Sequence, residues 1–156
     1  MQFSATLLGL IALAASANAH GKLFSPAALP NTTPFKNIRI PTNSCGQGVD
    51  TSGPATVTFQ AGSKRTITWN IDNGDGGGPL SVKFDTSGSG NNFNTVAQIT
   101  KNLQGANGGI PNSFPRGNHD IEIQVPDVKC ERCVLQVRQD INGNDGFGSC
   151  AVVSIQ

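Results

Sequence analysis

The sequence DIEIQVPDVKCERCVLQVRQ, residues 120–139, contains the alternation that decides the fold. Over residues 121–125, Ile, Ile and Val alternate with Glu and Gln. A period of two residues predicts a half-buried β-strand, here over residues 120–126. A turn then leads to a second expected strand at residues 133–139, so the two strands would form a hairpin.

Shorter stretches on both sides show the same pattern. Residues 55–60 and 64–70 are joined by a turn that contains Gly and would form another hairpin, whereas 80–84 and 150–155 are expected as single strands. A helical stripe of useful length is not found, although residues 93–104 could hold one helical turn. Two antiparallel sheets packed face to face are therefore expected. The predicted fold class is all-β, an immunoglobulin-like antiparallel β-sandwich with long loops.

The first nineteen residues have the features of a secretory signal peptide. An apolar run at residues 7–15 is too short to span a bilayer, and the tripeptide that ends at Ala19 fits the A-x-A cleavage rule. Cleavage there would make His20 the first residue of a single secreted domain, residues 20–156. An exported chain could also be glycosylated at Asn31, which begins an N-x-T sequon.

The amino-acid composition limits the kinds of binding partner that we expect. The formal net charge is +1 and only 13% of the residues are charged, so neither nucleic acid nor a membrane surface is an expected partner. The length that remains after cleavage suits one domain with one core. We expect an extracellular monomer.

The four cysteines predict disulfides, because an exported chain meets oxidising conditions. Three pairings are possible. We favour Cys45 with Cys150, and Cys130 with Cys133. A zinc or thioredoxin-like site at the CxxC sequence is the alternative, but the chain has neither a second CxxC nor a βαβ pattern.

Strand direction indicates which loops share an end of the sandwich. The expected hairpin of residues 120–139 would place His119 beside the loop 141–149. Whether the loop 71–79 lies at the same end depends on the order of the strands, which periodicity does not give. The Gly/Asn/Ser-rich stretch 86–118 shows little periodicity and is expected as a binding loop or a surface excursion.

Three features resemble the lytic polysaccharide monooxygenases. The mature chain would begin His-Gly, CERCVLQ follows at residues 130–136, and Phe147 stands three residues before Cys150. In that superfamily the N-terminal His binds copper through its amine and its ring, a second His completes the site, and Tyr or Phe fills the axial side. The resemblance implies that His20 binds copper and that Phe147 is axial. An N-terminal amine and an imidazole are ligands that suit Cu(II).

A narrower resemblance is to the fungal appressorium-associated secreted virulence factors. NGDGGGPL at residues 73–80, FPRGNHDIEIQVPDVKC at 114–130 and CVLQVRQDINGNDGFGSC at 133–150 are similar to that family's Gly- and Cys-spaced segments. This likeness covers roughly residues 66–156. It implies a secreted fungal protein that acts in virulence.

The chain differs from the monooxygenase pattern at the second metal ligand. The loop that carries that His in the superfamily reads NGDGGG here, and the sequence contains no Tyr for an aromatic sugar platform. A third ligand would have to come from His119, Asp145 or Asp75. His119 is favoured because imidazole binds Cu(II) well at neutral pH.

Three functions remain open. The first is a secreted effector or cell-surface protein that holds copper without being a catalyst, and we favour it. The second is a copper-dependent monooxygenase that acts on chitin or another polysaccharide. The third is a carbohydrate-binding module without metal. Cell-wall polysaccharide or a host surface is the expected partner, and no residue is assigned a catalytic role.

Overall fold

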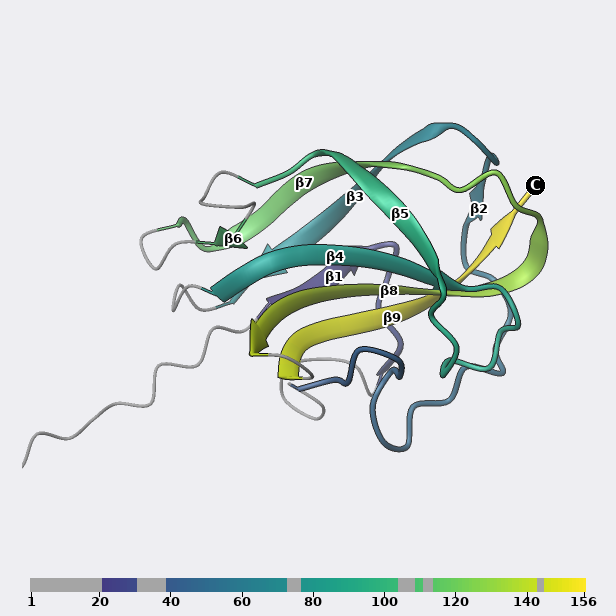
Figure 1. Cartoon of the computed structure of the whole chain (residues 1–156), viewed down its shortest axis with the longest axis horizontal. Coiled ribbons are helices and arrows are strands. Elements are labelled where there is room, and N and C mark those ends of the chain that lie inside the picture. Colours follow the sequence, from purple (N-terminus) through teal and green to yellow (C-terminus); the bar gives the residue numbers. More distant parts are fainter. Residues whose placement is uncertain (1–20, 31–38, 73–76, 104–108, 111–113, 143–144) are drawn as a thin grey trace, which may run out of the picture.

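Nine β-strands and their connecting loops form the part of the chain that the computed structural model describes (Figure 1). The described residues are 21–30, 39–72, 77–103, 109–110, 114–142 and 145–156. Within them there is no helix long and apolar enough to cross a membrane. The strands are β1 Gly21–Ser25, β2 Thr58–Phe59, β3 Lys64–Ile71, β4 Gly77–Asp85, β5 Thr95–Lys101, β6 Gly109–Ile110, β7 Gly117–Gln124, β8 Cys130–Asn142 and β9 Asp145–Ile155.

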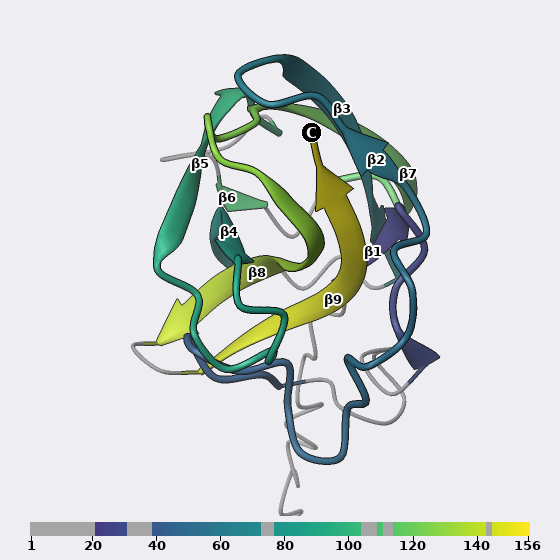
Figure 2. The same cartoon turned by 90° about the vertical axis from the view of Figure 1, so that its right-hand side faces the viewer.

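The strands form two layers that are joined at one edge. The order is β1-β3-β7-β5-β4-β8-β9-β2, with β6 paired to β4. One layer contains β1, β3 and β7, the other contains β4, β8 and β9, and β5 pairs with both β7 and β4. At the other edge β1 approaches β9, where the Leu23 amide donates a hydrogen bond to the Ser149 hydroxyl at 3.2 Å. Figure 2 shows how the sheet curls around its interior.

The core fills the space between the two layers. Trp69 and Ile121 face it from one layer, whereas Phe84 and Leu135 face it from the other, and none of the four is measurably exposed. Phe59 of β2 closes one end of this core, and its ring lies edge-on to that of Phe84, with 6.3 Å between the centroids. Each such side chain stabilises the fold by about 1.5–3 kcal/mol relative to an exposed one. The alternation over residues 121–125 predicted that Ile121, Ile123 and Val125 face the core, and all three are buried there.

The sandwich architecture and most strand positions agree with the sequence analysis, but the predicted strand pairs were wrong. β7 pairs with β3 and β5, and β8 pairs with β4 and β9, so residues 120–139 cross between the layers instead of forming a hairpin. β2 pairs in parallel with β9 and not with β3. Residues 95–101, where a helical turn was considered, form β5. Periodicity shows which face of a strand is buried, but not which strand lies beside it. The predicted and the observed pairings bury the same faces of these strands.

Disulfides join Cys45 to Cys150 and Cys130 to Cys133, the pairs that the sequence analysis favoured. Their Cα atoms lie 5.7 Å and 5.8 Å apart. The first disulfide links residues 105 positions apart in the sequence, and it fixes the long segment before β2 against β9. All four cysteines are thereby paired.

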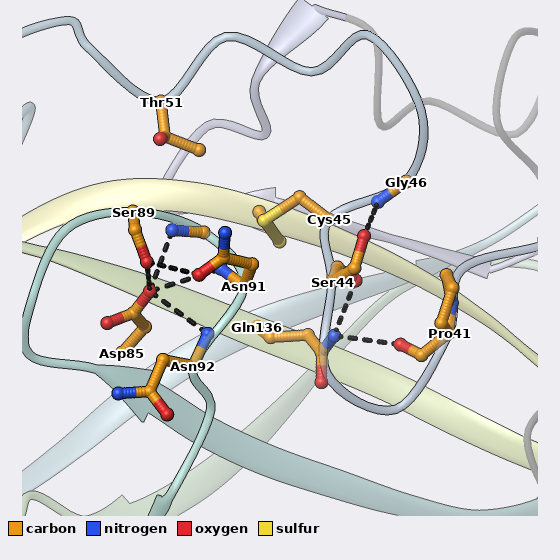
Figure 3. Close-up of a disulfide and its surroundings, with 12 residues drawn as sticks. Pro41, Ser44, Cys45, Gly46, Thr51, Asp85, Ser89, Asn91, Asn92 and Gln136 are labelled. Carbon is orange, nitrogen blue, oxygen red and sulfur yellow. Dashed lines mark hydrogen bonds between the residues drawn. A yellow bond between two sulfur atoms is a disulfide. The ribbon is translucent and has the colours of Figure 1, made fainter.

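The segment around Cys45 covers the outer face of β8 (Figure 3). The Gln136 side-chain amide donates hydrogen bonds to the carbonyl oxygens of Pro41 at 3.1 Å and Ser44 at 2.9 Å. The buried Arg138 donates from Nε to the Ile40 carbonyl at 3.0 Å. Polar side chains on this face therefore bind the backbone of the segment that covers them, which satisfies buried polar groups on both partners.

Candidate functional site

The ends of β1, β3, β7 and β9 described below lie together at one end of the sandwich (Figure 1). Gly21 at the start of β1 pairs with Ile71 at the end of β3, and Ile71 pairs with Gly117 at the start of β7. The start of β9 at Asp145 lies at the same end. The end of β3 therefore lies at the same end of the sandwich as the end of β8 and the start of β9, which answers the question that strand order had left open.

Several predicted site residues fall outside the described part of the chain. His20, Asp75 and Asn31 lie there, and for Asp145 the structure describes only the backbone position at the start of β9. His20 immediately precedes Gly21, which is held by the pairing of β1 with β3. Within the described residues, no group of three His, Cys, Asp or Glu side chains could hold a metal ion.

Trp69 packs directly beneath the start of β1. Its indole ring occupies the space that a Cβ atom on residue 21 would need, so only Gly fits at this position. The ring is fully buried, and its Nε1–H has no hydrogen-bond partner. A buried donor without a partner costs about 1–3 kcal/mol. Trp69 thus places an unsatisfied N–H group next to the residue that follows His20.

Phe147 lies on the core side of β9 near the same end. It is 3% exposed, and the Arg39 guanidinium carbon lies 5.9 Å from the centroid of its ring. Its partner on β8 is Gln139, which is also buried and whose Nε2 has no hydrogen-bond partner. Phe147 precedes Ser149, the residue that binds β1, by two positions. These contacts place Phe147 toward the end of the sandwich at which β1 begins.

His119 lies on β7 opposite Trp69. Its Nε2 is 2.8 Å from the carbonyl oxygen of Pro115, and its ring is edge-on to Phe114 at 4.7 Å between centroids. Because a carbonyl only accepts, Nε2 must carry the proton, and in the neutral ring the lone pair is then on Nδ1. Ligating histidines commonly donate their other N–H to a carbonyl in this way. His119 can therefore offer Nδ1 to a metal ion.

The register separates His119 from the start of β1. Gly21 and Gly117 stand two strands apart, and His119 follows Gly117 by two residues. With about 4.8 Å between strands and about 3.4 Å per residue, the Cα atoms of Gly21 and His119 are about 12 Å apart. The structure brings both residues to one end of the sandwich, but it does not make them neighbours.

A cluster of polar groups surrounds Asp85, the last residue of β4, at the opposite end of that strand from the site described above (Figure 3). The Asp85 carboxylate is completely buried and accepts hydrogen bonds from the hydroxyl groups of Ser87 and Ser89 and from the amides of Gly90 and Asn91. Burial by itself raises the pKa of this carboxyl, but the hydrogen bonds outweigh it and lower the pKa to about 2. Because its surrounding groups are donors, this carboxylate anchors a loop instead of binding a cation.

Sequence reasoning missed the unpaired donors and the Asp85 anchor. The period of two residues marks Trp69 as a core residue, yet it says nothing about where an indole N–H points. The sequence DTSGSGNN at residues 85–92 did carry a signal, because Asp, Ser, Gly and Asn favour side-chain-to-backbone turns. It was included in the stretch that lacked periodicity.

Two solved structures of polysaccharide monooxygenases have a similar fold. A polysaccharide monooxygenase CBM33, studied by X-ray photoreduction, has a TM-score of 0.54 and 16% identity, covering 88% of this chain and 100% of that one. An AA10 lytic polysaccharide monooxygenase from Streptomyces lividans has a TM-score of 0.54 and 12% identity, covering 86% and 99%. At such identities the likeness shows a shared β-sandwich fold.

Sequence comparisons give a narrower result. A comparison with curated proteins finds no match. The model of one protein family, described as Egh16-like virulence factor, matches residues 13–142, which is most of the chain. The match includes β1, Trp69, His119 and all of β8. The chain therefore belongs to the Egh16-like virulence factor family.

Proposed function

We propose that this virulence-factor family member is secreted, begins at His20 after cleavage, and holds copper at that end without acting as a polysaccharide-cleaving enzyme. The observation that carries the proposal is that the start of β1, Phe147 near the start of β9, and His119 near the start of β7 lie at one end of the sandwich. The two disulfides and the predicted signal peptide support export.

The chemistry of the N-terminus fits copper. His20 would offer a free amine, whose pKa near 8 allows a metal to displace its proton, and an imidazole nitrogen in the same residue. Gly21 is fixed against Trp69 and paired with Ile71. Bound copper would supply reversible one-electron chemistry. In this proposal, β1 serves to present the amine and imidazole of His20 to copper.

A third ligand would come from one of three loops or strands. His119 remains our first choice because its Nδ1 is the nitrogen left to a metal. The distance of about 12 Å between the Cα atoms of Gly21 and His119 requires residue 20 to turn toward β7. Asp145, at the start of β9, and Asp75 are the alternatives, and a carboxylate would make the site less selective for copper than imidazole.

The described residues contain no exposed aromatic platform, which supports a role without polymer cleavage. A catalyst on a solid polysaccharide needs a surface that lies against the polymer. The sequence has no Tyr, and its single Trp is buried in the core. Among the described residues, the exposed large apolar side chains are Phe24 and Val96, which lie on different strands.

The proposal is tested by titrating Cu(II) into the mature protein and recording paramagnetic resonance. We expect one nitrogen-ligated site that is lost in His20→Ala. A matched control carries one additional alanine before His20, which keeps the imidazole but moves the amine, and its spectrum should differ from that of the wild type. His119→Ala should weaken binding if Nδ1 is the third ligand. An unchanged spectrum in both N-terminal variants would show that the site does not involve His20.

The second candidate is a copper monooxygenase that acts on chitin, and the fold shared with two polysaccharide monooxygenases favours it. It is distinguished by incubating the copper-loaded protein with chitin and a reductant, and by mass spectrometry of the soluble products. We expect no oxidised oligosaccharides. Their release by the wild type, and not by His20→Ala, would replace our proposal with this enzyme. Sugar binding without any copper binding would instead indicate the carbohydrate-binding module.

A further inference from the structure

A hollow of about 410 Å³ opens between the end of β5 and the start of β7. Its volume lies within the range of about 300–1,000 Å³ that is usual for small-molecule sites. The base is apolar and consists of Leu103, which is nearly buried, and Phe114, which is half-buried. His119 stands against Phe114, so two rings line one side.

The rim of the hollow carries groups of both signs. Lys101, Asn102 and Asp120 line it, and all three are exposed. Asp120 accepts a hydrogen bond from the Thr68 hydroxyl through Oδ1 at 2.8 Å, which leaves Oδ2 as an acceptor toward a ligand. Asn102 uses its Oδ1 to accept from the Leu103 amide at 2.8 Å, which leaves its NH₂ group as a donor. A ligand with hydroxyl groups can satisfy such a mixture because each hydroxyl both donates and accepts.

We propose that this hollow binds one pyranose ring of a neutral oligosaccharide. The apolar C–H face of the ring would pack on Phe114 and Leu103, while its hydroxyl groups bind Asn102 and Asp120. The opposite charges of Lys101 and Asp120 disfavour a ligand with a large net charge of either sign. This site goes beyond the proposed function, because none of these contacts requires copper at His20.

The hollow lies in the same region of the molecule as the proposed copper site. His119 belongs both to the wall of the hollow and to the end of the sandwich at which β1 begins. A sugar held there would lie beside His119. The hollow would therefore hold a polysaccharide chain at this end of the protein even when no metal is bound.

The test uses ¹⁵N-labelled mature protein that has been freed of metal with EDTA. Chitotetraose, cellotetraose and laminaritetraose are titrated separately, and amide shifts are followed by NMR. We expect shifts at residues 101–103 and 114–120 with at least one of them, and a Kd in the range of about 1 mM, as a single sugar subsite of this size would give. Tetragalacturonate, which is charged, should bind more weakly.

Two variants and one control assign the site. Phe114→Ala should raise the Kd about tenfold, because it removes the aromatic base. Since Phe114 also packs against the core, Asn102→Ala provides a second, exposed variant that should raise the Kd about fivefold. Phe24→Ala removes an exposed aromatic ring from β1, outside the hollow, and should leave the Kd unchanged.

The proposal is overturned if none of the neutral tetrasaccharides shifts these amides, if both variants bind as the wild type does, or if tetragalacturonate binds more tightly than the neutral sugars. Copper titration of the same preparation after the EDTA has been removed keeps the two proposals separate. Sugar binding with no copper binding would refute only the proposed function. Copper binding with no sugar binding would refute only the sugar site.

Discussion

At the scale of a single residue, Asp85 shows how a buried carboxylate organises a loop. It accepts hydrogen bonds from both sides of the turn that follows β4, and the Gly90 carbonyl in that loop then accepts from the Cys45 amide at 3.1 Å. Thr51 donates to the Gly88 carbonyl at 3.1 Å. One ionised side chain thus connects β4 with the segment that contains the long-range disulfide.

The low pKa of Asp85 predicts a defined loss of stability in acid. Its pKa is about 2 in the folded protein and 3.8 ordinarily, so the unfolded chain takes up the proton first as the pH falls. The stabilisation is complete above about pH 4 and is lost between about pH 4 and pH 2, by about 2 kcal/mol. Urea denaturation of the wild type and Asp85→Asn across this range should show the difference, and the variant should lack this step.

Asp127→Asn provides the control for this measurement. Asp127 is an exposed aspartate in the turn before β8, so its replacement should leave the acid step intact. If Asp85→Asn were as stable as the wild type at pH 7, the carboxylate would not anchor the loop.

The residues of the candidate site were only partly predictable. His119 and Phe147 were named because of their chemistry and spacing, and they lie near the starts of β7 and β9, at the end of the sandwich where β1 begins. The distance between Gly21 and His119 was not predictable, because it depends on which strand lies between them. The unpaired N–H groups of Trp69 and Gln139 were not predictable either, since they depend on ring and amide orientations within the core.

At the scale of an element, β1 is fixed by a glycine as much as by hydrogen bonds. A Cβ atom on residue 21 would overlap the Trp69 ring, and the buried ring has little room to move. Gly21→Ala should therefore lower the free energy of unfolding by about 1–3 kcal/mol. Thermal denaturation monitored by circular dichroism measures this. Gly53→Ala is the matched control, because its Cβ would meet nothing within 4 Å, and it should have little effect.

The strands themselves were predicted better than their partners. The apolar alternation located β3, β7, β8 and β9 to within a few residues, because each has one face in the core. It did not find β5, whose burial is irregular and whose two halves pair with different strands. Pairing is determined by how layers close around the core, and a single strand's pattern contains no information about that closure.

At the scale of the whole molecule, the two disulfides should contribute very differently. The Cys45–Cys150 bond closes a loop between residues 105 positions apart, which restricts the unfolded chain by about 4–5 kcal/mol in the chain-entropy model. The Cys130–Cys133 bond spans three positions and should contribute less than about 2 kcal/mol. Replacing each pair with alanine and measuring guanidinium denaturation tests this. Equal losses would show that native-state contacts, and not chain entropy, dominate.

The position of β9 determines when, during synthesis, the core can close and the Cys45–Cys150 disulfide can form. β9 lies between β8 and β2 and also contacts β1, so the core remains open until residues 145–155 have been synthesised. Translation at about 5–20 residues per second makes Cys150 about 5–20 s after Cys45. Cys130 and Cys133 are made late in that interval, and until Cys150 follows, the native partner of Cys45 is still absent. Oxidation before the last strand emerges would therefore join Cys45 to the wrong thiol, and correct folding depends on the disulfide forming late.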